Sequence, residues 1–402
     1  MKSMVTAAEA IEIIRQNTRI LGSVTVAVEH AVGRILTEDI CAQENIPPFD
    51  NAGMDGYAVR HEELQTAPKT LSVVGEIPAG SEAAVPLRPG ETMAIMTGAK
   101  IPPGCTAVVQ QEDTRPAGTS EVTILRPVRE GENIRRAGND VQCGSVVLKA
   151  RTQLRPQDLG VLASLGIQFV EVFRAPRVAL LATGKELVPP AKNPPPGKIR
   201  NSNTSVLTAL LNEAGCEVID LGIASDTEDD LRAAIQRGLS ADMLITMGGV
   251  SVGKFDLVKK VFAEIGVQIF FSKVSVKPGM PTVFGMKERT VVFGLPGNPV
   301  SSMITFLIFV HPAIWHMTGL SDRHSVPHFR AHIGHSITKA DQKRHFVRGI
   351  LESRDGILWV KATGAQTSNI LTSLSLANCL MIIPEEVAEV SEGSEVEVEL
   401  LS

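Results

Sequence analysis

The chain has 402 residues, more than one ordinary domain, which indicates two to four domains. Hydrophobic residues make up 44% and aromatic residues only 4%, so the cores must be built mainly from Val, Ile, Leu and Ala. Lys and Arg number 39 against 44 Asp and Glu, a formal net charge of −5. This balance argues against a protein held to nucleic acid by phosphate contacts, although it allows a local basic pocket for a small anion.

The cysteines and the N-terminus point to a soluble cytoplasmic protein. No two cysteines have CxxC spacing, which argues against a cysteine zinc site and suits reduced thiols. The N-terminal residues show no apolar core with a cleavage signature, so we expect no signal peptide. The most apolar run, 303–310, is too short to span a bilayer, and we expect no membrane partner. The five cysteines are Cys41, Cys105, Cys143, Cys216 and Cys379.

The first 172 residues are predicted to be rich in β-structure after one helix. Thr6 and Glu9 form a capping box ahead of an amphipathic helix that runs to about Gln16. Short apolar runs then alternate with Gly- and Pro-rich turns up to about residue 172. The predicted strands include SVTVAVEHAV, TLSVVGEI, TMAIMTG, TAVVQQED and EVTILRPV.

The segment 173–320 has a different pattern, and the pattern changes again after it. Apolar strands RVALLAT, EVIDLGI, DMLITMGG and TVVFGL alternate with helical stretches, which predicts a doubly wound, parallel α/β sheet. The Pro-rich PPAKNPPPGK that follows the first strand is predicted to be a stiff, exposed linker. Beyond 320 the strands return, ending in the alternating EVEVELL, which predicts a half-exposed sheet or small barrel.

Three loops of the α/β segment follow strands and should meet at one edge of the sheet: ATGKEL (182–187), GGVSVGKFD (248–256) and GLPGNPVSS (294–302). In the last, Asn298 is a candidate N-cap and Pro299 the first helical residue, so free N–H groups with Ser301 and Ser302 could hold an anion. The alternative is that each loop is only a tight strand-to-helix turn.

Charged residues outside these loops form further candidates. Lys273 and Lys277 are four apart on an extended segment and should share a face, where they could hold an oxyanion or could simply be solvated. FDNAGMDGYAV carries Asp50 and Asp55, and NIRRAGNDV carries two arginines and Asp140. These suit magnesium-assisted phosphate chemistry, or ordinary turns.

Seven of the nine histidines lie between His311 and His345. In HFRAHIGH, His328 and His332 would share a strand face while His335 would point away, and no carboxylate or Cys has ligand-like spacing. Metal binding is the weaker interpretation of this segment.

Six motifs, in their order along the chain, resemble those of the molybdopterin molybdenumtransferase family, which includes MoeA and the E domain of gephyrin. They are FDNAGMDGYAV, NIRRAGNDV, ATGKEL, GGVSVGKFD, KPGMP and GLPGNPVSS. The resemblance implies an elongated N-terminal module (1–48 and 143–172), an inserted β-rich domain (49–142), an α/β molybdopterin-binding domain (173–320) and a C-terminal β-barrel (321–402). It also implies a homodimer with a shared active site.

Family members insert molybdenum from molybdate into adenylylated molybdopterin with Mg2+ and release AMP. The resemblance therefore implies Mg2+ as cofactor, a pterin nucleotide and an oxyanion as substrates, and a molybdopterin adenylyltransferase and acceptor molybdoenzymes as partners. It implies catalytic roles for Asp55, Asp140, Glu186, Asp256, Lys273 and Lys277, with Glu186 and Asp256 at the metal. The substrate-binding residues it implies are Thr97, Arg135, Asp226, Gly248, Gly249, Ser251, Pro296, Gly297, Asn298, Pro299 and Ser301.

The chain departs from the family pattern at three positions. Lys185 stands where an acidic residue is usual, Met280 replaces a lysine, and Gly53 replaces an alanine. With these changes the anion is held somewhat differently, or the chain is a paralogue with altered metal or nucleotide handling. Two alternatives to the molybdenum-inserting enzyme also stay open: a paralogue that inserts tungstate, and a non-catalytic pterin-binding or scaffold protein. Retention of Asp55, Asp140, Glu186 and Asp256 favours the enzyme.

Overall fold

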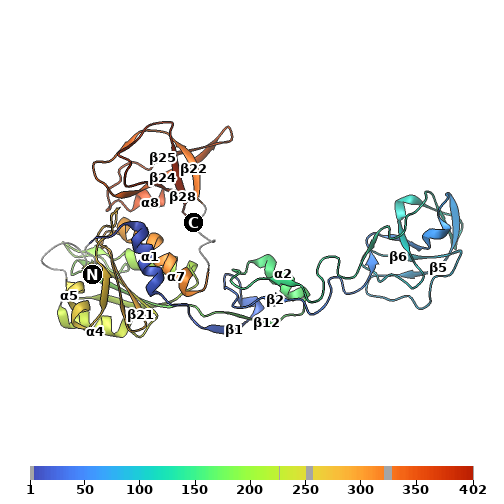
Figure 1. Cartoon of the computed structure of the whole chain (residues 1–402), viewed down its shortest axis with the longest axis horizontal. Helices are drawn as coiled ribbons and strands as arrows, with labels where there is room; N and C mark the ends of the chain where they lie inside the picture. Colours follow the sequence, from blue (N-terminus) through green and yellow to red (C-terminus); the bar gives the residue numbers. More distant parts are fainter. Residues whose placement is uncertain (1–3, 226, 250–256, 321–327, 402) are drawn as a thin grey trace. The chain divides into compact units, whose positions relative to one another are not determined.

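The computed structural model describes residues 4–225, 227–249, 257–320 and 328–401 (Figure 1). The chain forms two compact units, each treated by itself below. The first comprises Met1–Thr25, Gly33–Thr37 and Glu171–Ser402, and the second Val26–Val32 and Glu38–Val170. β1 (Ser23–Ala27) and β12 (Phe169–Phe173) lie where the chain passes between the units. This division is coarser than the four predicted modules, whose boundaries remain a prediction.

The first unit is built on a six-stranded sheet in the order β16-β13-β17-β21-β20-β18. Its four parallel strands are the four predicted from apolar runs, which confirms the doubly wound α/β class. They are β13 (Arg177–Thr183), β16 (Glu217–Ala224), β17 (Met243–Met247) and β21 (Thr290–Leu295). β17 and β21 are buried along their whole length because helices cover both faces of the sheet.

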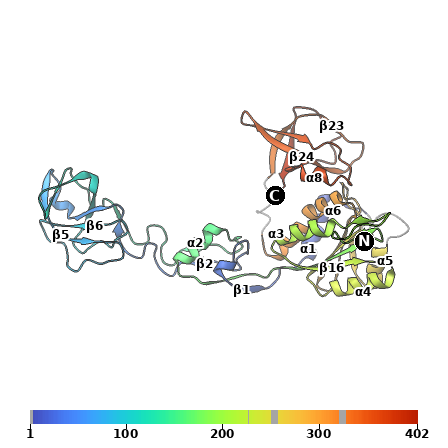
Figure 2. The same cartoon turned by 180° about the vertical axis from the view of Figure 1, so that it is seen from behind.

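Alternate residues of each strand enter different cores, as the period of two requires. Val178, Leu180 and Ala182 of β13 join one core, while Ala179 and Leu181 join the other. The first core is covered by α1 (Ala7–Asn17), α3 (Asn203–Glu213), α6 (Pro299–Thr305) and α7 (His311–Met317). The second is covered by α4 (Glu228–Gly238) and α5 (Leu257–Glu264), which lie together on the other side of the sheet (Figure 2).

The predicted capping box at the start of α1 is confirmed. The Glu9 backbone N–H donates to Thr6 Oγ1 at 3.2 Å, and the Thr6 N–H donates to Glu9 Oε2 at 2.9 Å. Ala7, Ala10 and Ile14 of this helix are buried.

One edge of the sheet corrects the prediction that it is wholly parallel. β20 (Val283–Lys287) runs antiparallel to β21 and to the edge strand β18 (Gln268–Phe271), and neither strand was predicted. A two-residue hairpin between Lys287 and Thr290 reverses the chain, with Glu288 at φ 55°. This turn lacks the Asn-Gly or Asp-Gly signal that would reveal it in a sequence.

The apolar run 303–310 belongs to a longer helix than its length suggested. Within the described residues, the stretch Pro299–Met317 is the one helix long and apolar enough to cross a membrane, with 61% of its apolar window buried. Its centre is a π-helical turn at Phe306–Val310, and Ile304, Phe306 and Phe309 are fully buried in the first core. The apolar run is thus used in the core of the first unit.

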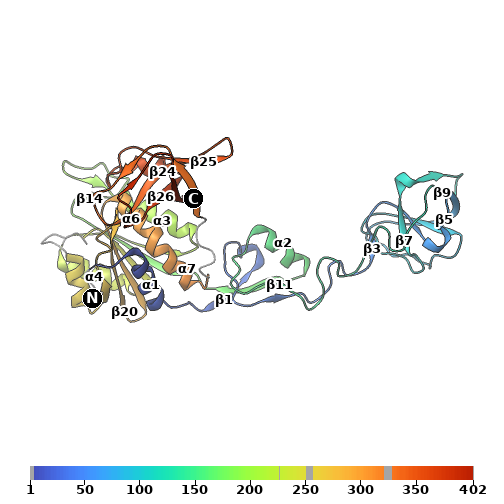
Figure 3. The same cartoon turned by 45° about the horizontal axis from the view of Figure 1, so that its top comes forward.

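The C-terminal part forms the predicted small barrel. Five strands close on themselves in the order β24-β25-β22-β28-β26, because β26 also pairs with β24 (Figure 3). They are β22 (His328–Ile333), β24 (Arg344–Arg354), β25 (Ile357–Ala362), β26 (Cys379–Ile383) and β28 (Glu395–Leu400). A sixth strand, β19 (Val276–Lys277), adds to β24 from the α/β part of the chain. The shorter elements here are β23 (Ile337–Thr338), β27 (Glu389–Val390) and α8 (Thr372–Ser375).

The second unit contains a six-stranded sheet in the order β7-β4-β6-β5-β9-β8, which confirms the predicted β-rich character. Its strands are β4 (Gly56–Val59), β5 (Lys69–Ile77), β6 (Glu91–Ile95), β7 (Ala107–Gln110), β8 (Thr114–Pro116) and β9 (Glu121–Ile124). Two further pairs complete the unit: β3 (Asn51–Ala52) with β10 (Ile134–Arg135), and β2 (Ile40–Cys41) with β11 (Val146–Leu148).

One helix of the second unit was missed. α2 spans Pro156–Ser164 in a region predicted to contain only strands and turns. Proline occupies its first turn, and the Asp158 carboxylate accepts from the Arg155 N–H at 2.9 Å and from Arg155 Nε at 3.1 Å. With Arg rather than Ser, Thr, Asn or Asp at the N-cap and only nine residues, α2 lacks a recognisable helix start.

Candidate functional site

The three strand-end loops of the α/β sheet meet, as predicted, at the carboxyl ends of β13, β17 and β21. A β-carbon at Gly248 would lie 2.6 Å from the carbonyl oxygen of Thr183, and one at Gly297 would lie 3.5 Å from the Gly248 α-carbon. Gly248 adopts φ 92° and Gly249 φ 66°, conformations that favour glycine. The backbone approach is therefore too close for side chains at this edge.

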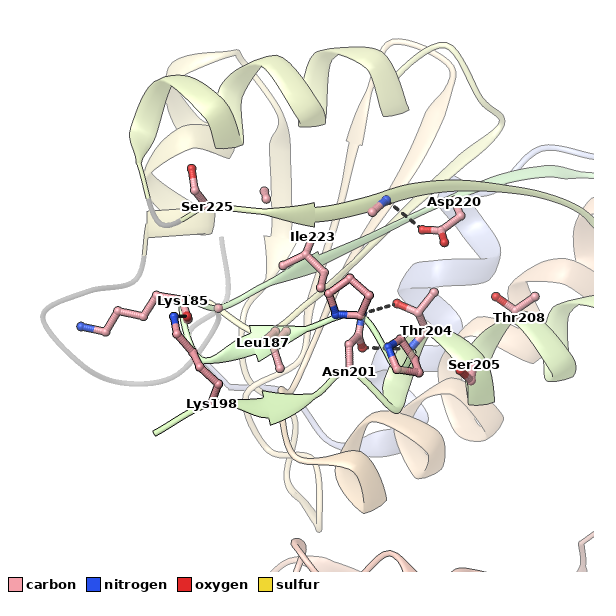
Figure 4. A pocket seen from close by; sticks show the side chains of 15 residues that line it. Lys185, Leu187, Lys198, Asn201, Thr204, Ser205, Thr208, Asp220, Ile223 and Ser225 are labelled. Atoms are coloured by element: carbon pink, nitrogen blue, oxygen red, sulfur yellow. Dashed lines mark hydrogen bonds between the residues drawn. The ribbon is translucent and has the colours of Figure 1, made fainter. Parts of the chain in front are cut away.

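A cavity of about 820 Å³ opens beside the first of these loops, at the ends of β13 and β16 (Figure 4). Lys185 and Lys198 lie toward one end of it, and Asp220 and Thr208 toward the other. We call it the strand-end cavity. Its lining residues are Gly184, Lys185, Leu187, Pro189, Pro190, Lys198, Asn201, Thr204, Ser205, Thr208, Asp220, Gly222, Ile223, Ala224 and Ser225.

None of these lining residues was among the predicted site residues, although Gly184, Lys185 and Leu187 lie in the predicted ATGKEL loop. β14 (Leu187–Val188) pairs with β15 (Ile199–Arg200), so the intervening Pro-rich stretch is folded back and Pro189 and Pro190 reach the cavity. The Lys198 ammonium donates to the Lys185 carbonyl oxygen. Pairing of strands this short is set by tertiary contacts, so the sequence suggested only a linker.

Glu186 lies next to the cavity lining and is exposed. Its carboxylate folds back over Gly184, since a β-carbon there would lie 2.7 Å from Glu186 Oε1. Asp226, Ser251 and Asp256, also predicted for this edge, lie outside the described residues.

The predicted N-cap residue of α6, Asn298, is confirmed at that position, with its side chain bonded to another partner. Asn298 holds the N-cap position with Pro299 in the first turn, but its Nδ2 donates to Ser368 Oγ at 2.9 Å. The Val300 N–H donates to the Ser368 carbonyl oxygen at 3.3 Å. Ser368 thus supplies an acceptor that a capping side chain would provide, and fewer N–H groups are available for an anion than predicted.

The other predicted residues of this loop differ in exposure. Gly297 and Asn298 are exposed and Pro299 is half-buried, whereas Pro296, Ser301 and Ser302 are buried. Ser302 Oγ is buried and has no hydrogen-bond partner among the described residues. The exposed part of the loop is therefore its first turn, and the serine side chains face the core.

Arg348 holds the loop that brings Ser368 to α6, and no sequence signal suggested it. The side chain is fully buried and donates from Nε to Ser373 Oγ at 3.0 Å. Its Nη atoms donate to the carbonyl oxygens of Gln366 at 3.2 Å and Thr367 at 3.1 Å. Burial lowers the pKa of this guanidinium. Arg348 is an interior arginine whose guanidinium donates to backbone and hydroxyl oxygens.

Lys273 and Lys277 occupy the segment between β18 and β20, where β19 pairs with the barrel strand β24. Val274 and Val276 between them are fully buried, while Lys273 is half-buried and Lys277 exposed, so the two lysines share the outward side as predicted. Lys277 Nζ lies 3.8 Å from Asp341 Oδ2 in the barrel.

The second unit brings Asp55 and Thr97 together. Asp55 Oδ1 accepts hydrogen bonds from the Thr97 N–H and from Thr97 Oγ1, both at 2.7 Å. The backbone and side-chain hydrogen bonds from Thr97 lower the pKa of Asp55, which therefore remains a carboxylate near neutral pH.

The remaining charged residues of the second unit divide into structural and exposed groups. Arg136 Nη1 binds Asp50 Oδ2 at 2.6 Å, and the Ala137 N–H donates to Asp50 at 2.8 Å, so this pair organises a turn. Arg135 is exposed and donates to the Gly53 carbonyl oxygen at 3.3 Å. Asp140 is exposed, and its N–H donates to the Ile46 carbonyl oxygen at 3.0 Å.

The predicted site residues therefore divide into a first and a second cluster, defined only by the unit to which each residue belongs. Asp55, Thr97, Arg135 and Asp140 belong to the second unit, and the other described site residues belong to the first.

The histidine segment of the barrel has ordinary partners. His328 Nδ1 lies 2.5 Å from Glu397 Oε1, and His332 Nδ1 lies 2.8 Å from the Gly393 carbonyl oxygen. Over the ranges that the structure describes, no three His, Cys, Asp or Glu side chains are grouped as metal ligands.

Three family models match the chain in order. They are the MoeA N-terminal region (domain I and II) at residues 5–166, a probable molybdopterin binding domain at 179–316 and the MoeA C-terminal region (domain IV) at 330–401. Together with the closed barrel and the strand-end cavity, they define a protein with a molybdopterin-binding type of α/β domain.

Curated relatives and solved structures match over nearly the whole chain. The molybdopterin molybdenumtransferase of Haemophilus influenzae is 39% identical over 374 residues, covering 92% of each chain. Molybdopterin molybdenumtransferase 2 of Mycobacterium tuberculosis is 37% identical, covering 96% of this chain and 97% of that one. The crystal structure of the molybdopterin biosynthesis MoeA protein from Pyrococcus horikoshii OT3 superposes with a TM-score of 0.85 at 32% identity, covering 99% of this chain and 100% of that one. The chain therefore belongs to the molybdopterin molybdenumtransferase (MoeA) family.

Proposed function

We propose that this chain is a transferase of molybdenum cofactor biosynthesis that inserts molybdenum from molybdate into adenylylated molybdopterin and releases AMP. The observation that carries the proposal is the strand-end cavity. Its volume of about 820 Å³ suits a ligand of nucleotide size. Leu187, Pro190 and Ile223 offer apolar contact to a ring system, while Lys185 and Lys198 offer positive charge to phosphate.

The lysines beside the barrel are assigned to the oxyanion. Lys273 and Lys277 lie on the outward side of one segment, and their ammonium groups can approach a small dianion such as molybdate. The dithiolene sulfurs of the substrate would bind the molybdenum, so the protein needs no cysteine ligands.

We assign the second cluster to the same reaction through a homodimer with a shared active site. Asp55, held as a carboxylate by Thr97, and the exposed Arg135 and Asp140 are suited to contact the substrate or its metal ion.

Glu186 fits a magnesium ion. Mg2+ is commonly held by one or two carboxylates together with substrate phosphates and water, and Glu186 presents an exposed carboxylate beside the cavity. When bound, the ion would neutralise phosphate charge. Glu186 itself would orient that ion against the cavity, and Asp256 is the predicted second ligand.

We assign the protein to the cytoplasm, where a molybdopterin adenylyltransferase would supply the substrate and molybdoenzymes would accept the product. These partners follow from the chemistry of substrate and product rather than from a surface of the chain.

The test is a single-turnover reaction of the purified protein with adenylylated molybdopterin, Mg2+ and molybdate, in which AMP release and pterin-bound metal are both measured. Glu186→Gln and Asp55→Asn are expected to lower the rate at least about 100-fold. Glu217→Gln is the matched control, since it removes an exposed carboxylate at the start of β16, 3.8 Å from Arg177 Nε.

Other outcomes of this reaction separate the alternatives. A clear preference for tungstate would identify a tungstate-inserting paralogue. Tight pterin binding with no AMP release under either oxyanion would refute the enzyme and leave a carrier or scaffold.

A further inference from the structure

The barrel determines where Lys277 lies. β19 pairs in parallel with β24, so that Val276 stands opposite Arg344 and Lys277 opposite His345. The Arg344 N–H donates to the Ser275 carbonyl oxygen at 3.0 Å, and Val276 is fully buried. The backbone of Lys277 is thereby fixed against the edge of the barrel sheet, leaving its side chain to respond to nearby charges.

One carboxylate of the barrel faces two lysines. Asp341 Oδ1 lies 2.6 Å from His345 Nε2 and accepts from the Lys343 N–H at 3.4 Å, so this oxygen is held in place. The second oxygen, Oδ2, lies 3.8 Å from Lys277 Nζ and 3.9 Å from Lys343 Nζ. A charge-assisted hydrogen bond is about 2.7–2.9 Å long, so both ammonium groups lie near the carboxylate without being bonded to it.

The charge states of this group follow from its surroundings. Partial burial opposes ionisation of Asp341, but its hydrogen bond to His345 and the nearby positive charges hold its pKa below the usual range. Burial lowers the pKa of His345, despite the opposing effect of Asp341. At neutral pH the group therefore contains two ammonium ions, one carboxylate and a neutral imidazole, which donates from Nε2.

Other cations at this edge of the barrel are engaged differently. The Lys339 ammonium, nine-tenths buried, donates to the carbonyl oxygens of Lys343 at 2.7 Å, Glu385 at 2.8 Å and Pro384. Arg344 Nε lies 3.1 Å from Glu385 Oε2. Lys277 and Lys343 instead share one carboxylate oxygen, Asp341 Oδ2, at 3.8 and 3.9 Å.

We propose that Asp341 is an internal counter-ion of the oxyanion site, which pairs with Lys277 and Lys343 in the empty enzyme and gives them up to the incoming oxyanion. The inference rests on the proposed function, because it takes Lys277 as an oxyanion holder, and it adds Lys343 as a second one. Asp341 then acts as a residue that sets affinity: its negative charge competes with the substrate for both ammonium groups and limits retention of the free anion.

The experiment measures binding of sodium molybdate to the full-length protein by isothermal titration calorimetry, with the Michaelis constant for molybdate measured in parallel. Asp341→Asn keeps an acceptor for His345 and removes the negative charge. It is therefore expected to lower both the dissociation constant and the Michaelis constant for molybdate about three- to tenfold. Lys343→Gln is expected to raise both by a similar factor. In Asp341→Asn, the dissociation constant should also rise more steeply with salt concentration than in the wild type, because one more net positive charge faces the anion.

Glu352→Gln is the matched control. Glu352 also lies between two cations, 3.1 Å from Arg354 Nη2 and 3.1 Å from Lys361 Nζ, and it is on the same strand as His345. Its neutralisation is expected to leave both constants unchanged, because those cations hold no substrate.

Different results overturn different statements. Weaker or unchanged binding in Asp341→Asn, or an equal gain in Glu352→Gln, refutes the counter-ion while leaving the proposed function standing. Unchanged binding in Lys343→Gln refutes the second holder. If Lys277→Gln binds molybdate as the wild type does, the assignment of Lys277 as an oxyanion holder in the proposed function is refuted, and with it the counter-ion that depends on it.

Discussion

Gly248→Ala should destabilise the first unit more than an ordinary glycine substitution at positive φ. Gly248 adopts φ 92°, and an added β-carbon would lie 2.6 Å from the Thr183 carbonyl oxygen, a backbone atom that cannot rotate away. The left-handed conformation costs an alanine about 1 kcal/mol, and overpacking costs a further ~1–3 kcal/mol. The free energy of unfolding should therefore fall by about 2–4 kcal/mol.

Gly215→Ala provides the control for the conformational part alone. Gly215 adopts φ 74° in the turn after α3, and nothing lies within 4 Å of its added β-carbon. The free energy of unfolding of Gly215→Ala should fall by only about 1 kcal/mol. The difference between the two variants therefore measures the cost of the close approach of the loops.

Both variants can be followed by tryptophan fluorescence during urea unfolding. The chain has two tryptophans, Trp315 in α7 and Trp359 in β25, and both lie in the first unit, so the signal reports that unit. Equal losses in the two variants, with unchanged dependence on urea, would show that the β13 and β17 loops are not packed as tightly as described.

Three further predictions follow from hydrogen bonds of buried or site groups. Thr97→Val removes one of the two hydrogen bonds that lower the pKa of Asp55, so it should move the acid limb of the pH–rate profile to higher pH. Thr97→Ser keeps the hydroxyl and should leave the limb in place. An unmoved limb in the valine variant would exclude Asp55 as the group that titrates. Arg348→Met should cost about 3 kcal/mol, because it leaves the carbonyl oxygens of its loop without their donor, and a urea midpoint equal to the wild type would contradict this. Asp242 accepts hydrogen bonds from the Arg174 guanidinium at 2.7 and 2.8 Å, and these bonds lower the pKa of Asp242 although burial of the carboxylate opposes this. The carboxylate therefore stabilises the fold at pH values above its pKa in the unfolded chain, about 3.9. This stabilisation is lost as the pH falls through its pKa in the folded protein. Asp242→Asn should thus cost about 3 kcal/mol at pH 7 and less below pH 4, and a cost independent of pH would refute the linkage.

Local patterns predicted much of the first unit. The four parallel strands were visible as continuous apolar runs, because a strand covered on both faces excludes polar residues along its length. Thr6 and Glu9 revealed the start of α1, because a capping box is a contact between residues three apart. The meeting of the Gly248 and Gly297 loops followed from strand order alone, since parallel strands present their carboxyl ends at one edge.

Contacts between distant residues account for the failures. Asn298 is the N-cap residue of α6, as predicted, but the acceptor for the Val300 N–H is the carbonyl oxygen of Ser368, seventy positions from Asn298. Ser368 is in turn held by the loop around Arg348, an arginine whose burial no local pattern indicates. The Pro-rich stretch after Glu186 looked like a linker, because pairing of β14 with β15 depends on the surrounding fold.

The sequence by itself determined the class of fold, its four parallel strands and the loops that meet at their ends, because these depend on periodicity and on residues close together in the chain. Tertiary structure alone decided the antiparallel edge strands, the walls of the strand-end cavity and the carboxylate that faces Lys277. The physical reason is that a residue pattern records which face of an element is buried, whereas partners far apart in the chain are chosen by packing and charge once the elements have assembled.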